Sequence, residues 1–280
     1  MPTIPDRHAT EPTQDSELEN VFRAICAIPN ATSILCEAVS QAVDEVVDPV
    51  RSGRWTVSQL DQPEKTIIGI RVENVLRMAL GLPRATHLDV VIDGTNVDIK
   101  FTINANWSIP PEAVGELCLL TRFNVQHVTV SAGLLRTTEP HLNAGRNRDQ
   151  KRSVSQRGRD AVRWIIYDMR PQGSVVGFLG AIDPESRIRL TDPTAGAQER
   201  LNRLFLTFKY EPISEKVVQA IALGHVDWSR RLRPDGQNPN APERRGFEVL
   251  RSTSYADRRR IIELELDPLP RGYCMAVDPV

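Results

Sequence analysis

Two short segments joined by a tight turn place the strongest constraint on how this chain folds. Leu88–Ile92 is dominated by β-branched and apolar residues, and Val97–Phe101 alternates apolar with charged side chains. Both patterns are typical of strands, the second with one buried face. Residues 93–96, Asp-Gly-Thr-Asn, have turn chemistry. The sequence therefore predicts a β-hairpin and, with the helical patterns around it, an α/β fold.

Three charged residues of this hairpin are expected to meet on one patch. Side chains two apart on a strand point to the same face, so Asp98 and Lys100 emerge together while Ile99 faces the core. Asp89 can reach the same patch from the neighbouring strand. Grouping these charges beside apolar strand faces is costly unless something compensates them. Mg²⁺, which prefers carboxylate oxygens, would do so; an ordinary salt-bridged hairpin surface is the other interpretation.

The spacing of these residues also fits phosphodiester hydrolysis. Two acids can hold Mg²⁺ against the scissile phosphate, and a lysine two residues beyond the second acid can orient or deprotonate the attacking water. Asp89, Asp98 and Lys100 follow the nuclease pattern Pro-Asp…(Asp/Glu)-x-Lys, with Leu88 in place of the proline. Asp93 is an alternative acid, but in a turn beside a glycine an aspartate is common for conformational reasons.

Periodic apolar residues predict the other elements of the first half. The predicted segments are two helices within Glu17–Val50 separated at Pro29-Asn30, a helix over Glu64–Leu80, a helix that begins within Glu112–Glu116, and a strand over Val125–Leu135. Trp107 is expected to pack in the core rather than to wedge against a base. Gly145–Arg163 holds seven Arg and Lys, and we interpret it as a basic linker.

The second half shows the order of a winged helix-turn-helix module: helix, helix, arginine-bearing helix, loop and hairpin. The predicted elements are a helix over Gln198–Lys209, a helix capped by Ser214, a short helix within His225–Arg233, and strands near Phe247–Arg251 and Ile261–Leu266. Arg230, Arg231 and Arg233 on the short helix are candidate DNA-binding residues. Arg258-Arg259-Arg260 is a second candidate, which would hold phosphate from the hairpin.

The distribution of charge favours DNA contacts in the second half. Residues 1–144 hold 11 Lys and Arg against 18 Asp and Glu, whereas residues 145–280 hold 24 against 18. The four cysteines lack the paired spacing of a zinc site or a disulfide framework. Residues 1–20 lack the apolar stretch of a signal peptide, and no apolar run reaches the roughly 18 residues of a membrane span. We therefore expect a cytoplasmic protein without membrane contact.

A set of short motifs resembles the NaeI family of type II restriction endonucleases over about residues 50–160. The motifs are Ser52-Gly-Arg-Trp55, Gln59-Leu60, Glu64-Lys65-Thr66, Gly69, Val72-Glu73, Gly94, Val97-Asp98-Ile99-Lys100-Phe101, Trp107-x-x-Pro110-Pro111-Glu112-x-x-Gly115 and Ala144-Gly-Arg-Asn147-Arg148-Asp149-Gln-Lys151-Arg152. The likeness is sparser afterwards, where it continues in Gln198–Phe205 and Arg230–Arg233. Spacing and flanking residues agree together, which makes the set specific.

The resemblance implies roles for four residues. Glu73, on the helix before the hairpin, matches the family's helix glutamate. Asp89 and Asp98 match its metal-binding acids, and Lys100 matches its catalytic lysine. Glu73 and the two aspartates are therefore the expected Mg²⁺ ligands. Ile99 stands where the family can have cysteine, a change that should be harmless on a buried face.

The resemblance also implies an organisation and a substrate. We expect a disordered tail at 1–16, an endonuclease domain at 17–162 with a restriction-endonuclease-like mixed sheet flanked by helices, and an α+β winged-helix DNA-binding domain at 163–280. Family members are bacterial enzymes that act as homodimers on double-stranded DNA. They need two copies of a short GC-rich palindrome, one of them bound as an effector. A strand-nicking repair endonuclease of the MutH type and a non-catalytic winged-helix regulator are the alternatives.

Overall fold

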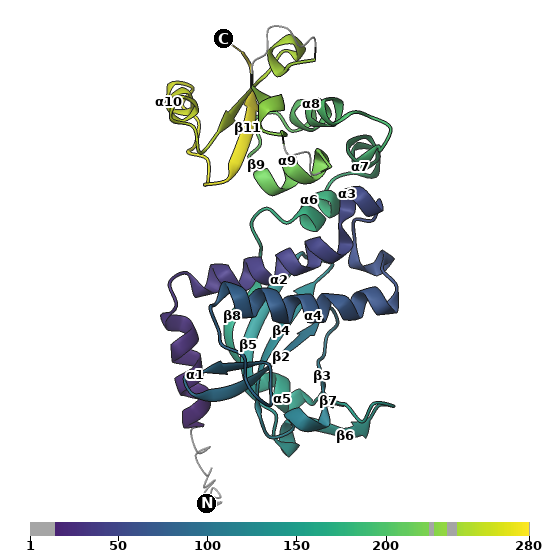
Figure 1. Ribbon diagram of the computed structural model, residues 1–280, viewed down its shortest axis with the longest axis vertical. Helices are drawn as coiled ribbons and strands as arrows, with labels where there is room; N and C mark the ends of the chain where they lie inside the picture. Colours follow the sequence, from purple (N-terminus) through teal and green to yellow (C-terminus); the bar gives the residue numbers. More distant parts are fainter. Residues whose placement is uncertain (1–14, 224–226, 234–239, 280) are drawn as a thin grey trace, which may run out of the picture.

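The computed structural model describes residues 15–223, 227–233 and 240–279, and these form two units along its long axis (Figure 1). The first unit, drawn in purple to teal, contains a five-stranded sheet and the longest helices. The second, in green to yellow, contains a three-stranded sheet and shorter helices. Residues 1–14 of the predicted tail lie outside the described part of the chain. Asp15 caps helix α1 (Ser16–Ala27), and its carboxylate pairs with Arg136.

A mixed sheet forms the centre of the first unit, in the order β1-β2-β4-β5-β8. Its strands are β1 (Val90–Ile92), β2 (Thr95–Thr102), β4 (Leu117–Asn124), β5 (Thr129–Arg136) and β8 (Arg163–Met169). Strands β2 and β4 run parallel, and the other neighbouring strands of this sheet run antiparallel. A mixed sheet flanked by helices is the α/β class that the sequence predicted.

Helices α2 (Ala31–Val47) and α4 (Gln62–Ala79) lie side by side against one face of this sheet (Figure 1). Their apolar stripes supply much of the core. Fully buried members are Leu35, Val39, Val43, Ile68, Val72 and Leu76. The short helix α3 (Pro49–Ser52) and a 3₁₀ turn at Val57–Gln59 connect them. A capping box between Asp61 and Glu64 starts α4 two residues earlier than predicted.

The two N-terminal helices, α1 and α2, bear on whether the described chain could cross a membrane. α1 and α2 meet at an 88° bend. Among the described residues, no single helix is both long enough and apolar enough to cross a membrane. This bent pair meets the criteria of length and composition only when its two helices are taken together.

The predicted β-hairpin is confirmed. Strand β1 pairs antiparallel with β2, with Val90 opposite Val97. Asp93 and Gly94 both have positive φ, 50° and 77°. This is the backbone of a two-residue turn whose twist matches that of the flanking strands. Asp93 therefore serves the turn, as its sequence context predicted.

A smaller antiparallel sheet, in the order β3-β7-β6, lies beside the main one. Its strands are β3 (Ser108–Ile109), β6 (Leu142–Arg146) and β7 (Arg152–Val154); a 3₁₀ turn (Glu139–His141) precedes β6, and helix α5 (Gln156–Asp160) follows β7. The prediction of a basic linker at Gly145–Arg163 is thus wrong. Leu142 and Val154 are buried in a core with Trp107, and these apolar positions among many arginines hold the segment in place.

Another local prediction is wrong, and a further one is confirmed with a later start. Glu112–Glu116 does not begin a helix, since this segment contains only a 3₁₀ turn at Pro111–Ala113 and three further residues before β4. The apolar run that opens β4 is fully buried, which a central strand requires and a helix start does not. The strand predicted over Val125–Leu135 begins only at Thr129, because the residues before it form the turn that follows β4.

The second unit places helices before and between short strands. Its elements are α6 (Val175–Ala181), α7 (Pro184–Thr191), α8 (Ala197–Thr207), β9 (Ile213–Ser214), α9 (Glu215–Ile221), a 3₁₀ turn (Pro242–Arg245), β10 (Glu248–Arg251), α10 (Tyr255–Glu263) and β11 (Tyr273–Val277). The sheet is antiparallel in the order β10-β11-β9. Helices α8 and α9 confirm two predictions, and the hydroxyl of Ser214 caps α9 by accepting from the Val217 amide.

The predicted strand near Ile261–Leu266 is wrong. Ile261 lies in helix α10, which begins where the hydroxyl of Ser254 accepts a hydrogen bond from the Asp257 amide. The antiparallel partner of β10 is β11 instead. The two strands of the expected hairpin are therefore separated by a helix.

The two units meet after strand β8. The second domain was predicted to begin at residue 163, but Arg163 opens β8, which pairs with β5 in the main sheet. The first unit therefore extends to Met169. At the junction the carboxylate of Asp44, on α2, accepts hydrogen bonds from the amides of Val175 and Val176 at 2.9 and 2.8 Å and so caps α6.

Candidate active site

The four residues predicted to carry the chemistry lie together near one edge of the main sheet. Asp98 and Lys100 both emerge from β2, and Nζ of Lys100 lies 2.7 Å from Oδ2 of Asp98. Asp89 directly precedes β1, and its Oδ2 accepts a hydrogen bond of 2.6 Å from the backbone N–H of Ile99. Glu73 comes from α4, near enough to Asp89 and Lys100 for both charges to shift its pKa.

Strand β4 supports these residues from behind. Cys118 lies opposite Asp98 in the parallel ladder, and its thiol donates to Oδ2 of Asp98 at 3.8 Å. Burial raises the pKa of the Cys118 thiol, which therefore stays protonated. The hydroxyl of Thr121 donates to the backbone carbonyl of Lys100 at 3.0 Å. The strand that carries the acid and the lysine is thus fixed by its neighbour.

Burial and mutual repulsion change the ionisation of the acids. Burial raises the pKa of Asp98 to about 6, which Lys100 opposes and nearby Asp89 reinforces. Burial also raises the pKa of Glu73, and the negative charge of Asp89 adds to this effect. Burial disfavours the charge of Lys100, but Asp98 and Asp89 outweigh it and raise the pKa of this ammonium. The positive charges of Lys100, Arg84 and Arg77 lower the pKa of Glu73 without outweighing its burial and the charge of Asp89. A further cation beside Asp98 and Asp89 would therefore stabilise the charged acids.

A cleft of about 530 Å³ opens beside this cluster. Glu73 and Lys100 line it, together with residues from α4, the end of β2 and the segment after it. Asp98 is nearly buried, with 6% of its side chain exposed, and it meets the cleft through its ion pair with Lys100. Lys151 also lines the cleft. Sequence reasoning placed this lysine in a linker, although it belongs to one of the family-like motifs.

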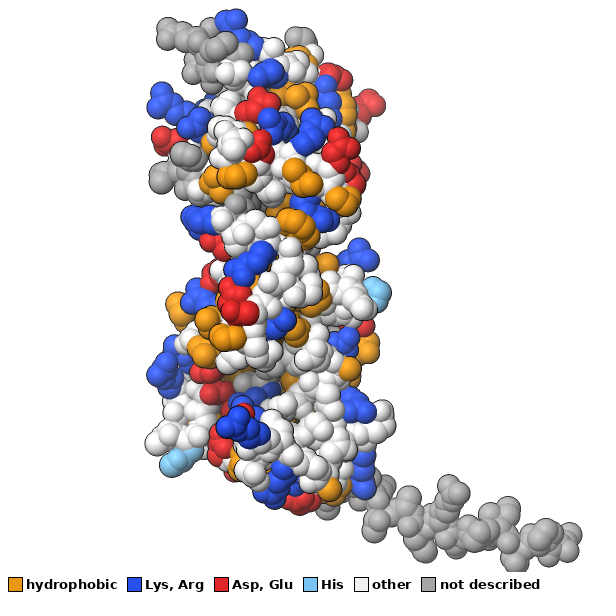
Figure 2. Space-filling view, turned by 90° about the vertical axis from the view of Figure 1, so that its right-hand side faces the viewer, with side chains coloured by type: hydrophobic (Ala, Val, Ile, Leu, Met, Phe, Trp, Pro, Cys, Tyr) orange, Lys and Arg blue, Asp and Glu red, His pale blue; other side chains and the backbone are white. Residues whose placement is uncertain are grey.

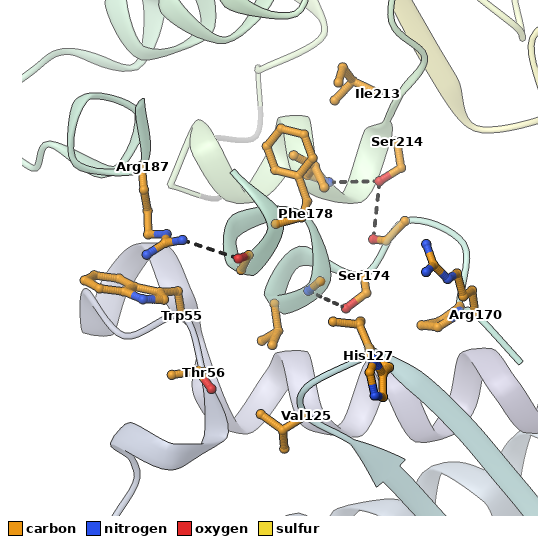
Figure 3. A pocket seen from close by; sticks show the side chains of 18 of the residues that line it. Trp55, Thr56, Val125, His127, Arg170, Ser174, Phe178, Arg187, Ile213 and Ser214 are labelled. Atoms are coloured by element: carbon orange, nitrogen blue, oxygen red, sulfur yellow. Dashed lines mark hydrogen bonds between the residues drawn. The ribbon is translucent and has the colours of Figure 1, made fainter. Parts of the chain in front are cut away.

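A larger cavity, of about 670 Å³, lies between the two units (Figure 3). The guanidinium of Arg187 lies over the ring of Trp55, 4.9 Å from its centroid, and Ser174, His127 and Arg170 line the other side. None of the four predicted residues lines this cavity. Glu73 and Lys100 line the smaller cleft instead, which makes that cleft the candidate active site, whereas the larger cavity lies between the units.

The donor set of the cleft fits Mg²⁺. The described residues contain no group of three or more His, Cys, Asp or Glu side chains already arranged around one metal position. Mg²⁺ does not need such a cage, because it is held through one or two carboxylates while waters and substrate phosphate complete its shell. Asp89 and Asp98 supply two carboxylates that repel each other. Glu73 is available as a third acid.

The structure gives no regular helix to the three candidate DNA-binding arginines. Arg230 and Arg231 lie in a 3₁₀ turn at Arg230–Leu232, and Arg233 follows it. The predicted helix over His225–Arg233 includes positions 225 and 226, which lie outside the described residues. Arg230 and Arg233 are exposed, whereas Arg231 is half-buried. The side chain of Leu232 anchors the turn in the core of the second unit.

The second arginine candidate lies on helix α10 rather than on a hairpin. Arg260 forms an ion pair with Glu248 at 3.2 Å, and Arg259 lies 3.9 Å from Glu263. Arg258 is exposed on the same helix. Two of the three arginines are therefore engaged within the second unit.

A mixed sheet flanked by helices, with two acids and a lysine on adjacent strands beside a cleft, is typical of endonucleases that cut DNA. The family model described as Restriction endonuclease NaeI matches residues 19–277, and the chain belongs to this family. The chain is also similar to the Type II restriction enzyme NaeI of Lentzea aerocolonigenes. The two are 28% identical over 228 residues, which cover 79% of this chain and 71% of that enzyme. This membership makes the chain a site-specific deoxyribonuclease, a hydrolase of restriction–modification.

Proposed function

We propose that this enzyme hydrolyses double-stranded DNA at a short palindrome in a Mg²⁺-dependent reaction, with Glu73, Asp89, Asp98 and Lys100 as the site. The observation that carries the proposal is the ion pair of Asp98 and Lys100 on β2, with Asp89 and Glu73 beside it at a cleft. A hairpin surface without function has no need to bury Asp98 next to a second acid. This favours the nuclease interpretation over the ordinary salt-bridged hairpin.

Each side chain has a role that its surroundings support. Mg²⁺, when bound, would offset the charge that develops on the phosphate during hydrolysis. Asp89 and Asp98 would hold it, with Glu73 as the third acid. The ammonium of Lys100 lies beside Asp98 at the cleft. We assign it to orienting the attacking water and to stabilising the phosphate oxygens.

We also propose a homodimer. Two-fold symmetry in the protein that matches two-fold symmetry in the DNA is the simple way to cut both strands of a palindrome. A GC-rich site, with a second copy bound as an effector, is part of the same proposal and follows from the family resemblance alone.

The second unit is proposed as the winged DNA-binding module. The run α8–β9–α9 followed by β10 and β11, with β11 between β9 and β10, supports this assignment. Arg230, Arg231 and Arg233 are proposed to contact DNA from this unit. The endonuclease domain is then taken to extend through β8 to residue 169.

The test uses supercoiled plasmid and mixed-sequence linear DNA, each incubated with the purified full chain in Mg²⁺ and in EDTA. Discrete linear fragments that form only with Mg²⁺ would support the proposal, and sequencing their ends gives the site. Open circles alone, from a protein that is monomeric on gel filtration, would favour the nicking repair enzyme instead. DNA binding without cleavage in Mg²⁺ or Mn²⁺ would favour the regulator.

A further inference from the structure

A two-stranded arm stands out from the first unit beside the cleft. This arm, residues 142–154, consists of β6, β7 and the turn between them, and its tip projects away from the main sheet (Figure 1). All nine residues from Asn143 to Lys151 are exposed. Figure 2 views the molecule from the side toward which the tip projects, and basic side chains stand forward there beside a hollow in the lower unit.

The turn of the arm is held by its own hydrogen bonds. The side-chain oxygen of Asn147 accepts from the amides of Asp149 and Lys151 at 3.0 and 2.8 Å. The backbone N–H of Asn147 donates to the carbonyl of Lys151 at 3.0 Å, and Gln150 takes the left-handed conformation that closes the turn. An exposed segment with this many internal bonds can keep its shape without packing against the rest of the protein.

The base of the arm is anchored in the protein. Arg152 is only 8% exposed. Its guanidinium donates to the carboxylate of Glu139 at 2.6 Å and to the backbone carbonyl of Asn143 at 2.8 Å. On its other side β7 pairs with β3, with Ser108 opposite Ser153. The base of the arm is therefore fixed by side-chain hydrogen bonds of Arg152 and by strand pairing with β3.

The exposed part of the arm carries uncompensated positive charge. It contains Arg146, Arg148 and Lys151 against the single acid Asp149. Within the described residues none of these three cations forms an ion pair, whereas Arg152 at the base does. The first unit is otherwise acidic. The local excess of positive charge therefore makes the arm a suitable place for this unit to bind a polyanion.

The arm also shares the wall of the active-site cleft. Lys151 lines the same cleft as Glu73 and Lys100. Ser108, on the strand that pairs with β7, lines it as well. Any duplex whose phosphate reaches Lys100 must therefore pass beside the arm.

We propose that the β6–β7 arm contacts the DNA duplex at the cleavage site by entering its major groove. There Arg146 and Arg148 contact base edges, and Lys151 holds a backbone phosphate near the bond that is cut. The inference rests on the proposed function, since it names the element that meets the same substrate. A two-stranded ribbon fits the major groove, which is about 12 Å wide, and arginine is the side chain suited to the paired acceptors of guanine. Lysine, as a point charge, suits phosphate.

Two measurements on the full-length protein test the arm. The first is the affinity for a 30-base-pair mixed-sequence duplex in EDTA, followed by fluorescence anisotropy over a range of salt concentrations. Lys151→Ala should weaken binding to all sequences and lower the slope of log affinity against log salt by about 0.9, the value for one neutralised phosphate. Arg157→Ala, a change of an exposed arginine on α5 outside the arm, should behave as wild type.

The second measurement concerns specificity. The measured quantity is the ratio of the affinity for the site found by sequencing the plasmid fragments to the affinity for its single-base variants. Arg146→Ala and Arg148→Ala should each reduce this ratio by roughly tenfold to a hundredfold. These side chains are exposed, so the variants should keep the wild-type melting temperature. If all three arm variants keep the affinity, salt slope and sequence discrimination of the wild type, the proposed DNA contact of the arm is wrong. The proposed nuclease function would be unaffected by that result. If the wild-type chain never cuts DNA, but Lys151→Ala still lowers the salt slope, the proposed function is wrong. DNA contact by the arm would still be supported.

Discussion

The ammonium of Lys100 lies 2.7 Å from the carboxylate of Asp98, two residues earlier on the same strand. This ion pair compensates a charge that would otherwise be buried alone. It also holds the lysine in the wall of the cleft that Glu73 lines as well. The same two groups are thus a structural unit of β2 and the proposed chemical unit of the enzyme.

Replacing either member of this pair should abolish most cleavage while leaving the fold intact. Asp98→Asn and Lys100→Gln keep the side-chain volume nearly unchanged, and we expect the rate of single-turnover plasmid cleavage to fall at least about a hundredfold. Circular dichroism and DNA affinity in EDTA should change little. Asp93→Asn is the matched control, because asparagine tolerates the positive φ of this turn position. Cleavage at the wild-type rate by Asp98→Asn would contradict the assignment.

The Mg²⁺ requirement should depend on pH. Burial raises the pKa of Asp98 to about 6, and a metal ion must compete with the proton for this carboxylate. The half-saturating Mg²⁺ concentration should therefore be constant above about pH 6 and rise up to roughly tenfold per pH unit below it. Titration of cleavage with Mg²⁺ between pH 5 and 8 measures this. A Mg²⁺ requirement that stays constant across this range would show that Asp98 is not the titrating ligand.

Asp44 should stabilise the junction between the units. Asp44→Ala removes the acceptor for two amides of α6, and we expect it to lower the free energy of unfolding by about 1–2 kcal/mol. Asp44→Asn retains an acceptor and should cost less. Removal from water raises the pKa of Asp44 to about 6. The folded state therefore binds this proton more tightly than the unfolded chain, and the contribution of Asp44 to stability declines as pH rises from about 4 to 6.

Denaturant titrations at pH 5 and pH 8 would measure both effects of Asp44. The side chain of Asp44→Asn cannot titrate. The free energy of unfolding of this variant, relative to that of the wild type, should therefore be higher at pH 8 than at pH 5. Equal unfolding free energies for the wild type and the alanine variant at both values would rule out a role for this cap.

Trp107 should matter for stability rather than for DNA contact. It is 3% exposed, its indole N–H donates to the carbonyl of Thr121 at 2.8 Å, and its ring packs near Trp164. Trp107→Ala should lower the free energy of unfolding by about 3–5 kcal/mol. Trp107→Phe, which keeps most of the apolar volume, should cost less. An alanine variant with wild-type stability but lost DNA affinity would point to a wedge against a base.

Local signals made the shared strand face of Asp98 and Lys100 predictable from the sequence. The alternation of Val97–Phe101 and the turn at Asp93 act within a few residues of each other, so they fix which face Asp98 and Lys100 share. Glu73 has no such signal. Its place beside the hairpin depends on how α4 packs on β2, and only the resemblance to a family pointed to it.

Elements that depend on distant partners were predicted less well. Leu117 opens a central strand because β2 and β5 flank it, which the preceding residues do not reveal. Ile261–Leu266 alternates like a strand, yet Ser254 caps a helix that runs into it. The prediction of a linker at Gly145–Arg163 missed most of the arm, because its exposed charges hide the few buried residues that anchor it.

The amide of Ile99 lies beyond the part of β2 that pairs with β1, and it donates its hydrogen bond to the carboxylate of Asp89 instead. The carboxylate thus takes the place of a missing strand and protects the backbone between Asp98 and Lys100, which β4 protects on the other side. Amide hydrogens there should exchange among the slowest in the protein. The backbone that carries Asp98 and Lys100 therefore loses its conformational entropy at folding, and little of it remains to be lost when DNA binds.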